Sequence, residues 1–274
     1  FKMYEFLICL SLLCLAIGCR SFEFSIIRKF GALCIIATTF MGGYFMSGNS
    51  LLIGSIAGSV WFFIPCIDIL LRIRKLRLPL EKKMKNRFPP NREIFPQLGE
   101  FTNNVEVEGF EHIRDSGWEW GGVDQFIRFF YDKKARLQAT INFNSQSHLA
   151  VAYMSVCTRT TDGKTLMTWN YPFSYSMKLT PECTVNSVSN IESFSELIKI
   201  HNKFLASKGI LENDLEDSDP ESLDKITEKE MRDQVDHNLD KGLLRLSGSG
   251  TFSYSWKGLF YLWFQSIKDM IRLS

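Results

Sequence analysis

Charged side chains are distributed very unevenly along this 274-residue chain. The first 71 residues contain seven of them, whereas the rest of the chain contains 55. A wholly soluble globule, a disordered chain, a disulfide-rich secreted module or a collagen-like fibre would not separate apolar and charged residues in this way. The distribution predicts a membrane region over residues 1–71, followed by a water-soluble region.

Three apolar runs predict transmembrane helices at about residues 4–19, 30–46 and 51–71. The third run is long enough for a hydrocarbon core of about 30 Å. The polar residues 47–50 predict a tight turn, so the second and third helices form a hairpin. The first run is shorter. We expect a third membrane helix there, with a cleaved or lipidated signal as the alternative.

Small and charged residues in the third run predict specific contacts. Gly54 and Gly58 are four residues apart, so they lie on one helical face and allow another backbone to approach closely. We expect this face to pack against the second run of the hairpin, and a partner subunit is the alternative. Asp68 and Arg72 are also four residues apart, which predicts a local ion pair.

Residues 72–92 form a basic juxtamembrane stalk with nine Lys or Arg residues and a single acid, Glu81. The positive-inside rule places this stalk in the cytoplasm, which predicts a multi-pass protein of the cytoplasmic (inner) membrane with most of its chain on the cytoplasmic side. Anionic headgroups of the lipid bilayer are the expected partners, and nucleic acid is not. The side chains expected to bind headgroups are Arg72, Arg74, Lys75, Arg77, Lys82 and Lys83.

Residues 93–210 predict a cytoplasmic α+β domain, in which helices flank an antiparallel sheet. Residues 135–144 alternate between apolar and polar side chains, which is typical of a strand with one buried face. Residues 149–160 and 164–171 flank a turn signal and predict a hairpin. A further strand is expected over residues 173–179, where aromatic and aliphatic residues alternate with polar ones.

Helices are expected at both ends of this domain. Apolar residues from Phe95 to Val105 recur with helical spacing, and Gly109 is placed to end the helix. A capping box at Ser189–Glu192 predicts a second helix over Ile191–Ser207. Residues 110–114 predict a short strand, and residues 123–130 fit either a helix or a strand.

The remainder of the chain divides into an acidic and an aromatic segment. Residues 211–241 contain 12 acids against four Lys or Arg residues, and they predict a helix with an exposed acidic face. Residues 242–274 predict an aromatic amphipathic helix in the membrane interface, with packing on the cytoplasmic domain as the alternative. The residues expected at the interface are Trp256, Phe260, Trp263 and Phe264.

Motifs that carry chemistry are absent from the sequence. It contains no phosphate-binding glycine loop and no zinc-binding helix motif, and its seven cysteines form no Cys-x-x-Cys pair. We therefore predict no catalytic residue, no cofactor and no metal site. One weak ligand site, which a solvated turn would also explain, is expected at His112, Asp115, Trp118, Glu119 and Trp120.

These observations favour a non-catalytic, membrane-anchored accessory or scaffold subunit of a membrane protein complex, with other membrane-protein subunits as partners. A membrane-tethered sensor is the alternative, with a small ligand bound near Trp118 and Trp120. A membrane-bound enzyme centred on His112, Asp115 and Glu119 is the least favoured class.

Overall fold

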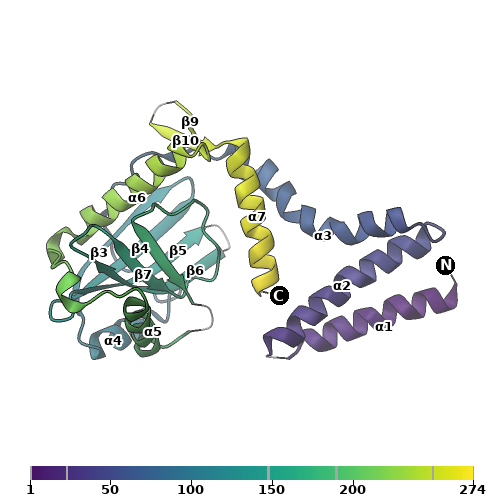
Figure 1. Ribbon diagram of the computed structural model, residues 1–274, viewed down its shortest axis with the longest axis horizontal. Coiled ribbons are helices and arrows are strands. Elements are labelled where there is room, and N and C mark those ends of the chain that lie inside the picture. Colours follow the sequence, from purple (N-terminus) through teal and green to yellow (C-terminus); the bar gives the residue numbers. More distant parts are fainter. Residues whose placement is uncertain (1, 23, 147–148, 189–190, 249, 274) are drawn as a thin grey trace. The chain divides into compact units, whose positions relative to one another are not determined.

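The computed structural model describes residues 2–22, 24–146, 149–188, 191–248 and 250–273. The chain has an α+β fold that divides into two compact units (Figure 1). One unit, the helical unit, combines residues 1–76 with residues 254–274. The other, the sheet domain, comprises residues 77–253.

Three long apolar helices begin the helical unit. They are α1 (Met3–Arg20), α2 (Ser25–Met46) and α3 (Leu51–Leu71). Each is long and apolar enough to cross a membrane. The expected helical hairpin and the expected third helix are therefore both present. Between α1 and α2 the backbones approach closely, because a Cβ atom on Gly31 would lie 3.0 Å from the carbonyl oxygen of Ala16.

Glycines also bring α2 and α3 together. A Cβ atom on Gly43 of α2 would lie 2.6 Å from the Cβ atom of Ala57 on α3. A Cβ atom on Gly54 would lie 3.1 Å from the carbonyl oxygen of Phe40, and one on Gly58 would lie 3.3 Å from the Cβ atom of Phe40. The small-residue face of α3 is therefore in contact with the other helix of its own hairpin.

The last helix, α7 (Trp256–Leu273), belongs to the helical unit and packs against α3. The indole Nε1 of Trp263 donates a hydrogen bond to the carbonyl oxygen of Phe62 at 2.7 Å, and its ring stacks on Phe63. Pro65 lies in the same part of α3 and removes a backbone donor there. Helix α7 thus contacts the turn of α3 that contains Pro65, a contact that the sequence did not predict.

Seven strands form the main sheet, in the order β2-β3-β4-β5-β6-β7-β8. Neighbours are antiparallel except for the parallel pair β7 and β8. The strands are β2 (Lys85–Asn86), β3 (Glu111–Trp120), β4 (Val123–Asp132), β5 (Leu137–Gln146), β6 (Leu149–Arg159), β7 (Thr165–Trp169) and β8 (Cys183–Ser187). A smaller sheet has the order β1 (Leu78–Pro79), β10 (Thr251–Tyr254) and β9 (Leu244–Leu246).

The sheet confirms some of the sequence predictions and contradicts others. The predicted hairpin of β6 and β7 is confirmed, and residues 123–130 lie in strand β4. The strand predicted over residues 173–179 is wrong: that segment is irregular, and the edge strand is β8. Because β8 runs parallel to β7, the chain must return along the sheet between them, and residues 170–182 make this connection. The basic stalk is not free, because it contains β1 and β2.

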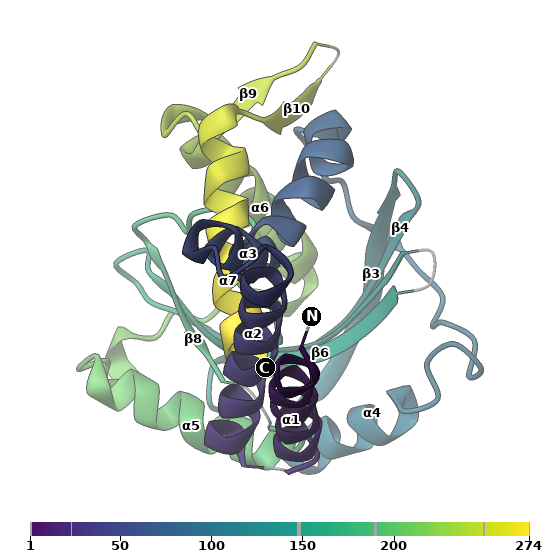
Figure 2. The ribbon, with the colours of Figure 1, turned by 90° about the vertical axis from the view of Figure 1, so that its right-hand side faces the viewer.

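Two helices, α4 (Leu98–Val107) and α5 (Phe194–Ser207), cover the convex face of the sheet (Figure 2). The core between them is apolar and includes Phe130, Ile141, Met154, Val156 and Leu197. Both helices were predicted, but α5 begins at Phe194 with Ser193 at its N-cap, three residues later than the predicted start at Ile191. Ser189 and Asn190, which were expected to cap it, lie outside the described residues.

Histidine 201 of α5 is buried in this core and hydrogen-bonded on both sides. Its Nε2 lies 2.8 Å from the hydroxyl of Thr158, and its Nδ1 lies 2.9 Å from the hydroxyl of Thr168. Burial lowers the pKa of His201 to about 4, so the imidazole is neutral at physiological pH. His201 is therefore a satisfied core residue.

The predicted acidic helix is α6 (Leu223–Asp240), and it lies on the concave face of the sheet (Figure 2). The strand predicted from the alternation of residues 135–144 is confirmed as β5, but the prediction that only one of its faces is buried is wrong. Helix α6 lies over its polar face, where Gln138, Thr140 and Asn142 are buried. Ion pairs fix the start of α6, since Arg114 binds Asp224 at 2.9 Å and Glu221 at 2.5 Å.

Two adjacent glycines test the packing of α2 on α3. Gly43→Ala should weaken the hairpin by about 1–3 kcal/mol, because the new methyl group overlaps Ala57. Gly42→Ala is the matched control, since nothing lies within 4 Å of its added Cβ atom, and it should be neutral or stabilising. The measurement is the SDS titration midpoint of the full chain in mixed micelles, by circular dichroism. Equal shifts for the two variants would contradict this packing.

Candidate functional site: a cavity between the sheet and helix α6

A cavity of about 910 Å³ lies in the sheet domain between α6 and the concave face of the sheet. Strands β4 to β8 form its floor, α6 forms its roof, and residues 179–182 close one side. This volume is within the range of pockets that hold drug-sized ligands. The cavity is therefore large enough for a small organic molecule.

The floor of the cavity is polar. The hydroxyls of Thr140 and Ser155 lie 2.7 Å apart, and the Nδ2 of Asn142 donates to Thr140 Oγ1 at 2.7 Å. Asn142 and Gln138 are only 6% and 5% exposed. Within the described chain, neither Asn142 Oδ1 nor Gln138 Nε2 has a hydrogen-bond partner. An acceptor and a donor thus remain available to a ligand in the cavity.

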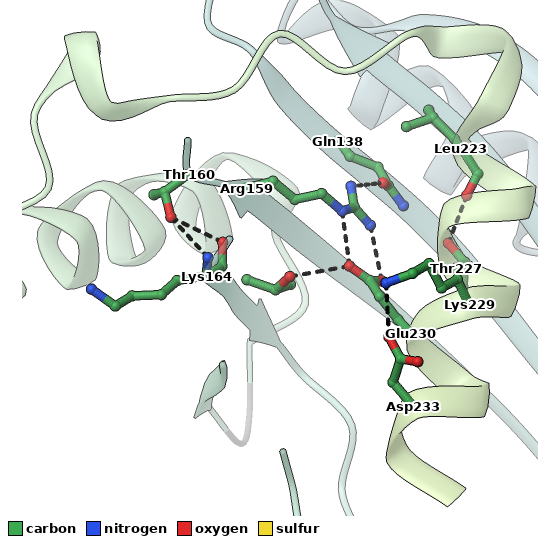
Figure 3. Close-up of polar contacts among 10 residues, drawn as sticks. Gln138, Arg159, Thr160, Lys164, Leu223, Thr227, Lys229, Glu230 and Asp233 are labelled. Carbon is green, nitrogen blue, oxygen red and sulfur yellow. Dashed lines mark hydrogen bonds and ion pairs between the residues drawn. The ribbon is translucent and has the colours of Figure 1, made fainter. Parts of the chain in front are cut away.

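A buried ion pair connects the floor to the roof (Figure 3). Arg159 at the end of β6 binds Glu230 of α6 through two hydrogen bonds, at 2.8 Å and 3.0 Å. Its third nitrogen donates to Gln138 Oε1 at 2.6 Å, and Thr165 donates to Glu230 at 3.1 Å. The Arg159 side chain is 8% exposed and that of Glu230 is 32% exposed. Glu230 therefore neutralises a cation that has almost no access to solvent.

Aromatic side chains form a wall of the cavity. The ring of Trp169 lies 6.1 Å from that of Tyr153 and 5.2 Å from that of Tyr175. All three residues line the cavity, and burial raises the pKa of Tyr153, which keeps its phenol neutral. The indole Nε1 of Trp169 is buried and has no hydrogen-bond partner within the described residues. This wall offers π-faces together with one free donor.

Carboxylates outnumber cations around the cavity by six to three. Each of the three cations is already paired: Arg159 with Glu230, Lys164 with Asp162 and Lys229 with Asp233. Three of the carboxylates have no ion-pair partner in the part of the chain that the structure describes. These are Glu182, Glu216 and Asp240, which are exposed to solvent. The cavity mouth is therefore negatively charged.

A single asparagine fastens α6 to the connection that closes the cavity. Asn238 is fully buried, and its Oδ1 accepts a hydrogen bond from the backbone nitrogen of Lys178 at 2.9 Å. Its Nδ2 donates to the carbonyl oxygen of Lys178 at 2.7 Å. This paired contact holds residues 170–182 against the helix in the absence of regular secondary structure.

The residues of the ligand site proposed from the sequence lie on strand β3, not in a loop, and none of them lines the cavity. His112 Nε2 contacts Asp115 Oδ1 at 3.0 Å. Asp115 is held by Arg128 through two hydrogen bonds, at 2.8 Å and 2.7 Å. Its carboxylate is therefore part of a structural ion pair on the sheet.

The other three residues of that group have separate contacts. Trp118 donates to Gln125, and Trp120 donates to the carbonyl oxygen of Arg77 at 2.8 Å. Glu119 lies 3.4 Å from Arg87. Because successive side chains of a strand alternate between faces, Glu119 and the two tryptophans point to opposite sides of β3. The five residues do not form a single site.

The basic residues expected at lipid headgroups have a range of contacts. The predicted Asp68–Arg72 ion pair is confirmed at 2.9 Å. Arg74 lies over the ring of Trp256 at 4.6 Å, and Lys82 lies over Trp118 at 4.5 Å. Burial lowers the pKa of Lys82 to about 8. In the described part of the chain, no cluster of three or more His, Cys, Asp or Glu side chains is suited to a metal ion.

The cavity residues carry only a weak signal in the sequence. Gln138, Thr140 and Asn142 alternate with apolar residues, as a solvent-exposed strand face also does. Arg159 and Glu230 are 71 residues apart, and no local pattern links them. No family model, curated protein or solved structure matches the chain.

The two members of the buried ion pair should differ in their importance for stability. Glu230→Gln leaves the cation of Arg159 buried without a counter-charge and should cost about 3–5 kcal/mol. Arg159→Met leaves a carboxylate that is one-third exposed and can be hydrated from the cavity, so it should cost less, about 1–2 kcal/mol. Hydrogen exchange of the β5 and β6 amides, measured by mass spectrometry on the full chain, reports these changes. Equal costs would contradict the assigned asymmetry.

Proposed function

We propose that this protein is a membrane-anchored binding protein that holds a small organic molecule in the cavity between the sheet and α6. One observation carries the proposal: hydrogen-bonding atoms of the cavity have no partner within the described chain, namely Asn142 Oδ1 and Gln138 Nε2 on the floor and the buried Trp169 Nε1 on the wall. Buried donors and acceptors cost free energy when they are unpaired, so a ligand that pairs with them is favoured. The sensor class considered from the sequence is thereby retained, with its site on a different part of the sheet.

The charged groups on the cavity floor are already paired, which favours binding over catalysis. Glu230 is neutralised by Arg159, and the remaining groups on the floor are amides and hydroxyls that bond to one another. A general base needs a carboxylate or imidazole free to accept a proton from the substrate. The unpaired carboxylates of the lining and the imidazole of His237 lie outside the floor strands. The floor supplies hydrogen-bonding groups that can orient a molecule.

Filling the cavity should abolish binding. Gln234 of α6 lines the cavity, and its side-chain amide makes no hydrogen bond in the described structure, so Gln234→Trp adds bulk without removing such a contact. Ligand-observed NMR with a library of water-soluble fragments would be recorded on the full chain in phosphatidylcholine nanodiscs. We expect hits for the wild type and their loss in Gln234→Trp.

The control for this experiment is Lys225→Trp, which places the same side chain on an exposed position of α6 outside the cavity. It should retain the wild-type set of fragments. An absence of fragments in the wild type, or an identical set in wild type and Gln234→Trp, would refute the proposal.

We further propose that the three apolar helices cross the cytoplasmic (inner) membrane and that the sheet domain lies in the cytoplasm. The basic residues 72–92 support this orientation through the positive-inside rule, and so do Arg20 at the end of α1 and Arg28 and Lys29 in the first turns of α2. The turn between α2 and α3 would then lie on the outer side. Anionic headgroups remain the expected counterions of the basic residues that face the membrane surface.

Cysteine labelling tests this topology. In a chain without native cysteines, Ser50→Cys should react with a membrane-impermeant maleimide in intact cells, because it lies in the outer turn. Lys133→Cys is exposed on the sheet domain and should react only after permeabilisation. Labelling of both positions from the same side would show that the proposed orientation is wrong.

A second candidate function is that of an accessory or scaffold subunit of a membrane protein complex. It is favoured by the aromatic side chains that α7 leaves uncovered, since Phe260 and Phe264 are 62% and 58% exposed. Native mass measurement after gentle extraction distinguishes the two functions: a stable hetero-complex supports the subunit, whereas a stable single chain argues against it.

A further inference from the structure

We infer that the molecule held in the cavity is a small organic cation, an ammonium or guanidinium compound with an apolar body. This inference rests on the proposed binding function and specifies the chemistry of the ligand. It combines three features of the cavity: the charge of its mouth, its aromatic wall and the two amide atoms on its floor.

The electrostatic field of the cavity favours positive charge. The three cations of the lining are neutralised by paired carboxylates, whereas Glu182, Glu216 and Asp240 are unpaired in the described structure. Low-dielectric walls concentrate the field of such charges and raise the local concentration of ions of opposite sign. A cationic ligand is therefore attracted to the mouth, and an anionic ligand is repelled.

The aromatic wall stabilises a cation after entry. Trp169, Tyr153 and Tyr175 line the cavity within one cluster of rings. Indole and phenol rings attract a cation to their faces through the ring quadrupole, and the attraction grows when the cation is removed from water. The apolar part of a ligand is accommodated by neighbouring side chains such as Met167 and Val185.

The floor provides polar contacts that fit the same ligand. Asn142 is only 6% exposed, its Oδ1 has no partner in the described chain, and an ammonium or guanidinium N–H can donate to it. The free donors, Gln138 Nε2 and Trp169 Nε1, require an acceptor elsewhere on the ligand, such as a hydroxyl or carbonyl oxygen.

An anionic ligand fits this cavity poorly. Arg159 is the only cation on the floor within the described lining, and its three nitrogen atoms are directed to Glu230 and Gln138. An anion would have to displace Glu230 and leave that carboxylate unpaired in a partly buried position, which is costly. The ion pair therefore excludes the type of ligand that a buried arginine usually binds.

Three probes of the same size separate the contributions of charge and shape. Tyramine, tyrosol and 4-hydroxyphenylacetate share a phenol ring and differ in their ammonium, hydroxyl and carboxylate ends. Their dissociation constants would be measured by ligand-observed NMR titration on the full chain in phosphatidylcholine nanodiscs at pH 7. We expect tyramine to bind about tenfold more tightly than tyrosol, and 4-hydroxyphenylacetate to bind most weakly.

Matched variants assign this preference to the cavity. Glu182→Gln/Asp240→Asn removes two unpaired carboxylates at the mouth and should weaken tyramine binding about threefold, with no change for tyrosol. Glu106→Gln/Glu108→Gln makes the same change in charge near the end of α4, outside the cavity, and should have no effect. Trp169→Phe should weaken tyramine binding more than tyrosol binding, whereas Trp120→Phe should not.

Some outcomes would overturn the inference without touching the proposed function. If tyrosol or 4-hydroxyphenylacetate binds as tightly as tyramine, or if none of the three binds, the ligand is not a cation of this class. The fragment experiment with Gln234→Trp judges the cavity itself, because it does not depend on ligand charge.

Discussion

The ion pair between Arg159 and Glu230 is the interaction on which the arrangement of the sheet domain depends. It attaches α6 to a sheet face that is polar, so apolar packing alone does not hold the helix there. Leu223 anchors the start of α6 among Ile127, Phe129 and Tyr131, but the middle of the helix spans the cavity. A helix that is anchored at its start, at Glu230 and at Asn238 can cover the sheet without filling the space beneath it.

This arrangement explains why the two faces of one sheet differ in composition. The face beneath α4 and α5 is packed with apolar side chains, and the buried His201 there has both ring nitrogens hydrogen-bonded. The opposite face carries amides, hydroxyls and an ion pair, whose polar atoms are only partly satisfied by one another. Close packing on the first face stabilises the fold. The second face can therefore retain buried polar groups, although they lower the free energy of unfolding when they are only partly paired.

Local patterns in the sequence predicted the elements that depend on residues close together in the chain. The apolar helices, the hairpin of β6 and β7, and the helices α4, α5 and α7 follow from periodicity and turn residues. Strand β3 could also have been recognised, because the pair Gly121-Gly122 is a signal for a two-residue hairpin turn. In the structure this pair joins β3 to β4, and both glycines adopt positive φ. Without that turn, the charged and aromatic residues of β3 resemble a solvated loop.

The cavity could not be predicted in this way, because it depends on which surface α6 covers. Polar alternation in β5 has the same appearance whether water or a helix lies over it, and a carboxylate in an acidic helix gives no sign of a partner 71 residues away. The parallel position of β8 is equally non-local, since it requires residues 170–182 to cross back along the sheet. The residues on the cavity floor are polar and buried, and Arg159 is paired with a distant part of the chain; burial and this pairing exist only in the folded structure.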